Sequence, residues 1–109
     1  MTRLYLLRHG STKSNRDGRY MGRSEEGLSG DGRWEVRQLA QRLASNELTA
    51  VYSSPLQRAK ETAQIVAQPH RLSTAIAPDF NELDLSRWAG LTATEIAARD
   101  PKAWDIWCN

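Results

Sequence analysis

The chain has 109 residues, which is enough for one domain at most. Its net charge is +2 and its basic residues are scattered, so it lacks the dense basic run of a nucleic-acid-binding surface. One cysteine excludes an internal disulfide, and no apolar run approaches the ~18 residues of a membrane helix. The first residues lack the apolar region of a signal peptide, so we expect a cytoplasmic protein with no membrane partner.

The first half of the chain predicts a strand, a helix and a second strand. Residues 3–8 contain an apolar run without alternation, which is typical of a buried strand. After a glycine-containing loop, Ser29 is a suitable helix N-cap, with Asp31 favourable in the first turn. Residues 50–53 are expected to form a short strand. The intervening helix is marked by apolar residues at helical spacing: Val36, Leu39, Ala40 and Leu43.

The second half predicts three further helices and a third strand. Ser54 is expected to cap a helix with Pro55 at its first position, and Pro69 is expected to end that helix. Residues 74–77 suggest a strand. Thr92 with Glu95 has the pattern of a capping box, and another helix is expected to open at Asp100-Pro101. The buried stripe of the first of these helices is predicted to be Leu56, Ala59, Ala63 and Val66.

The alternation of strands and helices predicts an α/β fold with a mainly parallel sheet. His9 and Arg58 both come just after predicted strands. Ligands of open α/β sheets bind at the carboxyl ends of the strands. The predicted topology therefore places these two residues where a ligand is expected.

The stretch LLRHGSTKSN at residues 6–15 joins an apolar run to a cation, an imidazole, a glycine and several hydrogen-bonding side chains. A lone His or Arg is usually an ordinary surface residue. The joint pattern, however, resembles the RHGxTxxN signature of the histidine phosphatase superfamily, the phosphoglycerate mutase-like proteins. The residues that carry this signature are Arg8, His9, Gly10, Thr12 and Asn15.

Three later segments continue the resemblance in the family's order. Gly22 and residues 27–32 are similar to the segment after the nucleophile, and residues 53–59 with Thr62 are similar to SSPLxRAxxT. Residues 81–84 and 88–92 resemble the loop of the acid donor. The resemblance implies a three-layer α/β/α fold in which residues 1–109 form one domain. It also implies a phosphatase-branch hydrolase acting on a small phosphorylated metabolite.

The resemblance assigns a role to each matching residue. His9 is the nucleophile that forms a phosphohistidine, and nearby guanidinium groups disfavour its protonated form. Glu82 is the acid that protonates the leaving group and then accepts a proton from water. The substrate-binding residues are Arg8, Thr12, Asn15, Gly22 and Arg58, and neither a metal nor a cofactor is expected, since two histidines and one cysteine give no metal-ligand spacing.

The chain departs from the family pattern in three places. Ser86 and Ala89 replace a glycine and a glutamate that are common around Trp88. The third departure is the absence of the family's second pocket histidine, because His70 is followed by Arg71 rather than glycine. We therefore expect these residues to be the N-terminal part of a catalytic unit that is nearly inactive alone. Its first strand should then present an unpaired edge.

Three other functions remain open from the residues. One is a cofactor-dependent phosphoglycerate mutase, although residues 83–88 look more like the phosphatase branch. Another is a non-catalytic phosphate-binding module, which the missing second histidine supports. The weakest is a nucleic-acid-binding fragment, whose affinity would depend strongly on salt. A homodimer is the oligomeric state left open by the sequence.

Overall fold

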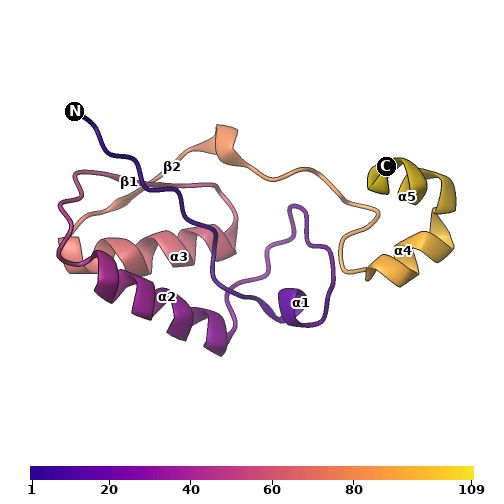
Figure 1. Cartoon of the computed structure of the whole chain (residues 1–109), viewed down its shortest axis with the longest axis horizontal. Helices are drawn as coiled ribbons and strands as arrows, with labels where there is room; N and C mark the ends of the chain where they lie inside the picture. Colours follow the sequence, from indigo (N-terminus) through magenta and orange to yellow (C-terminus); the bar gives the residue numbers. More distant parts are fainter.

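The computed structural model describes all of residues 1–109 (Figure 1). None of its helices is long and apolar enough to cross a membrane, and the longest has 14 residues. The α-helices are α1 (Lys13–Arg16), α2 (Gly30–Leu43), α3 (Gln57–Ala67), α4 (Ala93–Arg99) and α5 (Pro101–Cys108). The strands are β1 (Val51–Ser53) and β2 (Thr74–Ile76), and two 3-10 turns are η1 (Gln68–His70) and η2 (Pro78–Phe80).

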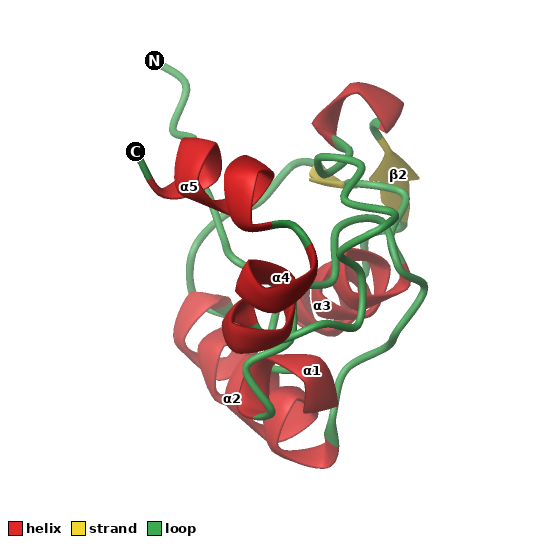
Figure 2. Cartoon of the chain, turned by 90° about the vertical axis from the view of Figure 1, so that its right-hand side faces the viewer, coloured by secondary structure: helices red, strands yellow, loops and turns green.

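The two strands form a parallel pair that is connected through α3, as the sequence predicts. Tyr52 lies opposite Ala75 in the register. Helix α3 packs against both strands and α2 packs against α3, so both helices lie on one side of the pair (Figures 1 and 2). The apolar contact between the helices is made by Leu28, Val36, Ala40 and Val66. This confirms an α/β fold with a parallel sheet, although a second helical layer is not formed by these residues.

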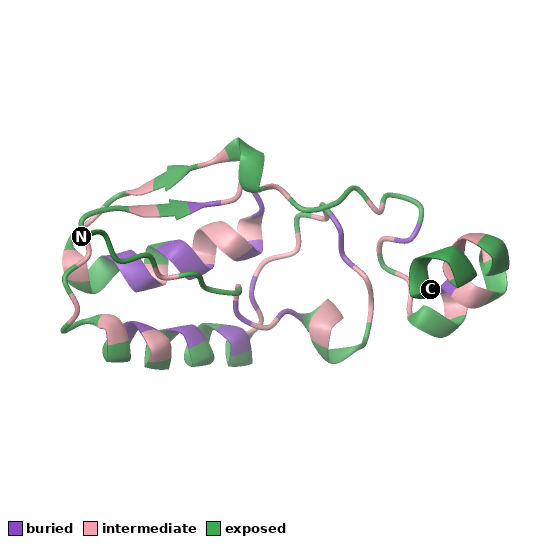
Figure 3. Cartoon of the chain, turned by 45° about the horizontal axis from the view of Figure 1, so that its top comes forward, coloured by how far each residue is buried: buried purple, intermediate pink, exposed green.

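Residues 3–8 do not form the buried strand that their apolar run predicts. The segment is extended but joins no ladder, and Leu4 and Leu6 are 78% and 86% exposed (Figure 3). The strands β1 and β2 pair only with each other, and residues 3–8 make no backbone hydrogen bonds to either, so the segment lacks the ladder that a strand needs. The radius of gyration of 16.1 Å also exceeds the roughly 13 Å of a compact domain of this size.

The predicted starts of α2 and α3 have different outcomes. Ser29 caps α2 as expected, because its Oγ accepts a hydrogen bond from the Gly32 backbone N–H at 3.0 Å. The prediction for α3 is wrong: the helix begins at Gln57, after an extended Leu56, rather than at Pro55. Leu56 is the N-cap instead: its extended backbone precedes the helix, and its carbonyl accepts the first helical hydrogen bonds, from the N–H groups of Ala59 and Lys60.

Helices α4 and α5 form a separate small unit beyond the end of the strands (Figure 1). Thr92 caps α4 through Glu95 N–H, but Glu95 pairs with Arg19 instead of completing the capping box. The unit has its own apolar centre at Ile96, which is fully buried. Four aromatic rings also pack edge to face in this region, at centroid distances of 5.7 to 6.0 Å: Tyr20, Trp88, Trp104 and Trp107.

Candidate active site

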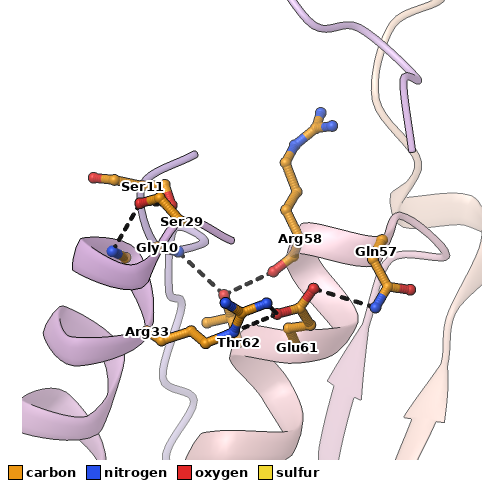
Figure 4. A network of polar contacts seen from close by, with 9 residues as sticks. Gly10, Ser11, Ser29, Arg33, Gln57, Arg58, Glu61 and Thr62 are labelled. Carbon is orange, nitrogen blue, oxygen red and sulfur yellow. Dashed lines mark hydrogen bonds and ion pairs between the residues drawn. The ribbon is translucent and has the colours of Figure 1, made fainter. Parts of the chain in front are cut away.

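The backbone after His9 is fixed to the helix that carries Arg58. The Gly10 N–H donates to Thr62 Oγ1 at 3.1 Å, and the Thr62 hydroxyl donates to the Arg58 carbonyl at 2.8 Å (Figure 4). A side chain at position 10 would meet Val36 Cγ2 at 2.6 Å, so only glycine allows this approach. Two segments 52 residues apart in sequence are thereby joined directly behind the predicted nucleophile.

The next residue of the loop is fixed to the start of α2. The Ser11 carbonyl accepts hydrogen bonds from both the backbone N–H and the hydroxyl of Ser29, at 3.0 and 3.1 Å (Figure 4). A Cβ atom at Gly32 would collide with the same carbonyl, so the loop lies directly on the first turn of α2. The loop that follows His9 is therefore supported from two helices.

The half-buried ring of His9 is oriented by the neighbouring backbone. Its Nδ1 lies 2.7 Å from the Gly10 carbonyl, which can only accept a hydrogen bond, so Nδ1 carries the proton and Nε2 keeps its lone pair in the neutral ring. Burial lowers the pKa of His9, and the positive charges of Arg58 and Arg8 lower it further. The Gly10 carbonyl and the Glu82 carboxylate oppose this pKa shift. A neutral imidazole with a free Nε2 is suited to nucleophilic attack.

Arg58 is a buried cation without a carboxylate partner. Its residue is only 2% exposed, and its guanidinium donates to the carbonyls of Gly22 and Ser24, at 2.6 Å from Nη2 and 3.0 Å from Nη1. Nε is buried and has no hydrogen-bond partner. Burial lowers the pKa of Arg58, an effect opposed by Glu82, Glu26 and Glu25, but an arginine stays charged in proteins. The site therefore holds positive charge and an unused donor, which favour an anionic ligand.

Gly22 shapes the turn that holds Arg58. It has a φ of +51°, a left-handed conformation that is strained for other residues. An added Cβ would also lie 3.0 Å from Leu85, so the turn sits directly against the segment that follows Glu82. The Gly22 carbonyl thus accepts a hydrogen bond from Arg58, and the left-handed backbone at Gly22 lets this turn lie against the segment that follows Glu82.

Thr12 and Asn15 form the N-terminal cap of α1. The Thr12 hydroxyl accepts from Asn15 N–H at 3.1 Å, while Asn15 Oδ1 accepts from both the backbone and the hydroxyl of Thr12. Thr12 is completely buried, and its hydroxyl serves this cap, while its contact with a substrate stays a prediction. The cap orients Asn15, whose amide Nδ2 has no hydrogen-bond partner among these contacts.

Arg8 and Glu82, the remaining predicted residues, are exposed. The charges of both reach His9, as their effects on its pKa show. Glu82 Oε1 accepts from the Leu83 N–H at 2.9 Å, and the Glu82 carbonyl accepts from Arg23 Nε at 2.7 Å. No group of three His, Cys, Asp or Glu side chains could hold a metal ion. The fold therefore brings His9 within electrostatic reach of Arg58, Arg8 and Glu82.

Sequence reasoning missed Arg23 and Ser24, which contact Glu82 and Arg58. The available signal was their position directly after Gly22 in the matched segment. A nearby surface hollow of about 290 Å³ includes Thr12 and Asn15 but neither His9 nor Arg58. Asp31 and Glu35 also line this hollow, and their negative charge disfavours a phosphate there.

Comparison with known proteins identifies the family. A model of the histidine phosphatase superfamily (branch 1) matches residues 4–109. A bifunctional protein of Mycobacterium tuberculosis is 43% identical over 107 residues, which are 97% of this chain and 29% of that protein. The adenosylcobalamin/alpha-ribazole phosphatase of Escherichia coli is 32% identical over 107 residues, covering 98% of this chain and 53% of the relative.

A solved structure of similar sequence has the same fold over this chain. The structure of a putative alpha-ribazole-5'-P phosphatase from Escherichia coli matches 93% of this chain and 51% of its own, with a TM-score of 0.85 and 30% identity. The chain spans about half or less of the length of the curated relatives it matches, whose names include phosphatases and probable phosphoglycerate mutases. Because the family model covers nearly the whole chain, the protein belongs to the histidine phosphatase superfamily, branch 1.

Proposed function

We propose that the intact protein is a phosphomonoester hydrolase that works through a phosphohistidine on His9. The observation that carries the proposal is Arg58, whose buried guanidinium has two neutral carbonyl partners, a free Nε and no carboxylate. An uncompensated buried charge is costly, and a bound phosphoryl group would neutralise it. The planar guanidinium also suits bidentate contact with phosphate oxygens.

The proposed first step transfers the phosphoryl group to His9. The Nε2 lone pair attacks phosphorus, the bond from phosphorus to the leaving oxygen breaks, and that oxygen takes a proton from Glu82. Arg58 and Arg8 stabilise the charge on the phosphoryl oxygens, and the Asn15 amide adds a neutral donor. His9 enters this step as the neutral ring, which its lowered pKa favours.

The proposed second step returns the enzyme to its starting state. Glu82, now a carboxylate, takes a proton from water, and the water oxygen attacks the phosphohistidine. The nitrogen–phosphorus bond breaks, inorganic phosphate leaves, and Nε2 recovers its lone pair. No redox change and no further reactant are needed.

A phosphoglycerate mutase is the second candidate, because some matching relatives carry that name. A mutase returns the phosphoryl group to another hydroxyl of its substrate, whereas a hydrolase gives it to water. Residues 83–88 after the donor resemble the phosphatase branch. We therefore favour hydrolysis.

We also propose that turnover requires chain beyond these residues. The apolar side chains Leu4 and Leu6 are exposed on an extended segment without a strand partner, and such a segment favours aggregation. A polypeptide of residues 1–109 should therefore be poorly soluble and nearly inactive beside the intact protein. Cooperative unfolding together with normal turnover of this polypeptide would contradict that proposal.

The test of the function is release of phosphate by the intact protein. We expect it to hydrolyse aryl and alkyl phosphomonoesters in the presence of a chelator, because arginines supply the positive charge at the phosphoryl group. Vanadate, which mimics the trigonal-bipyramidal state, should inhibit competitively. Phosphoglycerate isomerisation without phosphate release would support the mutase instead. Loss of activity with the chelator and recovery with Mg²⁺ would contradict the proposed chemistry.

A further inference from the structure

The segment that carries Glu82 has few attachments to the rest of the molecule. Within residues 81–86, the side-chain hydrogen bonds are local: Asn81 Oδ1 to Glu82 N–H, Glu82 Oε1 to Leu83 N–H, and Asp84 Oδ1 to Ser86 N–H. Its backbone hydrogen bonds also stay within four residues. The only hydrogen bond from these residues to a distant part of the chain is the one from Arg23 Nε to the Glu82 carbonyl, at 2.7 Å.

Arg23 belongs to the same turn that holds Arg58. The carbonyls of Gly22 and Ser24, on either side of it, accept from the Arg58 guanidinium. The side chain of the middle residue, Arg23, reaches the Glu82 carbonyl instead. One three-residue turn therefore contacts the phosphate-binding arginine with its backbone and the acid-bearing segment with its side chain.

Packing at Gly22 supports the same link. A Cβ atom there would lie 3.2 Å from the Leu83 carbonyl and 3.0 Å from Leu85, so the turn contacts the acid segment at Glu82 and at the residues that follow it. The Arg23 contact uses a backbone carbonyl and leaves the Glu82 carboxylate free to transfer protons. This is the arrangement expected of a residue that sets the position of an acid without taking part in the reaction.

We infer that Arg23 is a positioning residue that holds the general acid Glu82 at a fixed distance from the phosphoryl group bound to Arg58. The inference rests on the proposed phosphatase function. Its consequence depends on the leaving group. A poor leaving group needs the proton from Glu82, so displacement of this residue slows its departure, whereas a good leaving group departs as the anion.

The test compares phenyl phosphate with 2,4-dinitrophenyl phosphate in the intact protein. The quantity measured is kcat/KM, which reports the step that expels the leaving group. Arg23→Gln should lower kcat/KM for phenyl phosphate about 10- to 100-fold, the range expected for a small misplacement of a catalytic group. The value for 2,4-dinitrophenyl phosphate should stay within about 3-fold of wild type, since its departure needs little acid catalysis.

Two further variants separate positioning from folding. Arg23→Lys keeps a cation and an N–H donor, so it should retain most of the phenyl phosphate rate. Arg33→Gln is the matched control, because Arg33 is an exposed arginine that pairs with Glu61 instead of the acid segment. It should leave both rates unchanged. Thermal unfolding of each variant is recorded alongside.

The outcomes distinguish the inference from the function on which it rests. Equal loss with both substrates, or no loss with either, would overturn the role of Arg23 while the wild-type enzyme remains a phosphatase. Marked thermal destabilisation of both Arg23 variants would also overturn it, by showing that the contact is structural. A wild-type protein inactive on both substrates would instead overturn the proposed function.

Discussion

The two ends of the candidate site are built differently. At the phosphate end, Arg58 is buried in the first turn of α3, and the loop after His9 is hydrogen-bonded to α2 and α3. At the acid end, Glu82 is exposed on an extended segment whose one distant hydrogen bond comes from Arg23. The charge proposed to bind phosphate is thus part of the core, whereas the proposed proton donor is on a loop.

This difference indicates which substitutions should affect chemistry, binding and stability. In the proposed mechanism, the groups at the phosphate end act on the transferred phosphoryl group, which is the same in every phosphomonoester. The acid end would meet the leaving group, which differs between substrates. We therefore expect changes at the phosphate end to lower activity on all substrates, and changes at the acid end to depend on the leaving group.

The largest effect is expected for His9→Ala. Removal of the nucleophile should lower kcat by about 10³-fold or more on every phosphomonoester. The half-buried ring makes its hydrogen bond only to the adjacent Gly10, so the free energy of unfolding should change by no more than about 1 kcal/mol. His70→Ala is the control and should keep full activity. Equal losses of kcat in His9→Ala and His70→Ala would contradict the assignment of His9 as the nucleophile.

Arg58→Lys should have the next largest effect. Lysine keeps the charge but loses the planar fork that serves two carbonyls and the phosphoryl oxygens, so kcat should fall by about 10²-fold. Arg33→Lys, at an exposed ion pair, is the matched control and should change kcat by less than about 2-fold. A near-normal Arg58→Lys enzyme would mean that the fork geometry is not needed.

A smaller effect is expected where the two ends meet. Gly22→Ala forces a side chain into a left-handed position and against Leu85, and should cost about 2 kcal/mol of unfolding free energy together with some activity. Gly18→Ala is a close control, because its φ is +69° and nothing lies within 4 Å of an added Cβ. Its cost should be about 1 kcal/mol, with activity unchanged. Denaturant unfolding measures the loss of stability, and kcat measures the loss of activity. Equal losses in Gly22→Ala and Gly18→Ala would contradict the contact between Gly22 and Leu85.

The smallest effect is expected in the pH dependence. The pKa of His9 is lowered below the ordinary histidine value of 6.5, first by burial and then by Arg58 and Arg8. The unfolded chain then binds more protons than the folded one, so His9 contributes stability above pH 6.5 that is lost as the pH falls through its folded pKa. Neutral His9, and with it kcat/KM, should persist below pH 6.5.

Arg8→Gln tests this assignment, because it removes one of the positive charges that lower the His9 pKa. An NMR titration of the His9 ring should show a pKa closer to the ordinary histidine value, and the acid limb of kcat/KM should move to higher pH. Lys13→Gln is a suitable control, because Lys13 does not contribute to the His9 shift. An unchanged or lower His9 pKa in Arg8→Gln would contradict the electrostatic account.

Local signals in the sequence predicted much of the fold. The Ser29 cap, the strand pair at residues 50–53 and 74–77, and the helix opening at Pro101 depend on nearby residues, and the structure confirms them. The strand at residues 3–8 was predicted wrongly because a strand needs a partner, and pairing is not a local property.

The candidate site was predicted less completely. The motifs pointed to His9, Arg58 and Glu82, but the burial of Arg58 could not be foreseen, since arginine is mostly exposed in proteins. The position of Arg23 after Gly22 marked it as a neighbour of the motif, but its contact spans 59 residues, so the sequence did not show that its partner is Glu82. The motif did not reveal that the Thr12 hydroxyl caps α1, and the role of Thr12 toward a substrate stays a prediction.

The central claim is that His9 carries the phosphoryl group during turnover. The most direct measurement is to mix the intact protein with a ³²P-labelled phosphomonoester, denature it in alkali and locate the label. A phosphohistidine is stable in alkali and labile in acid, so the label should survive the first treatment, disappear in the second and map to His9. It should be absent from His9→Ala. An acid-stable label on a serine, or an equal label in His9→Ala, would contradict the account.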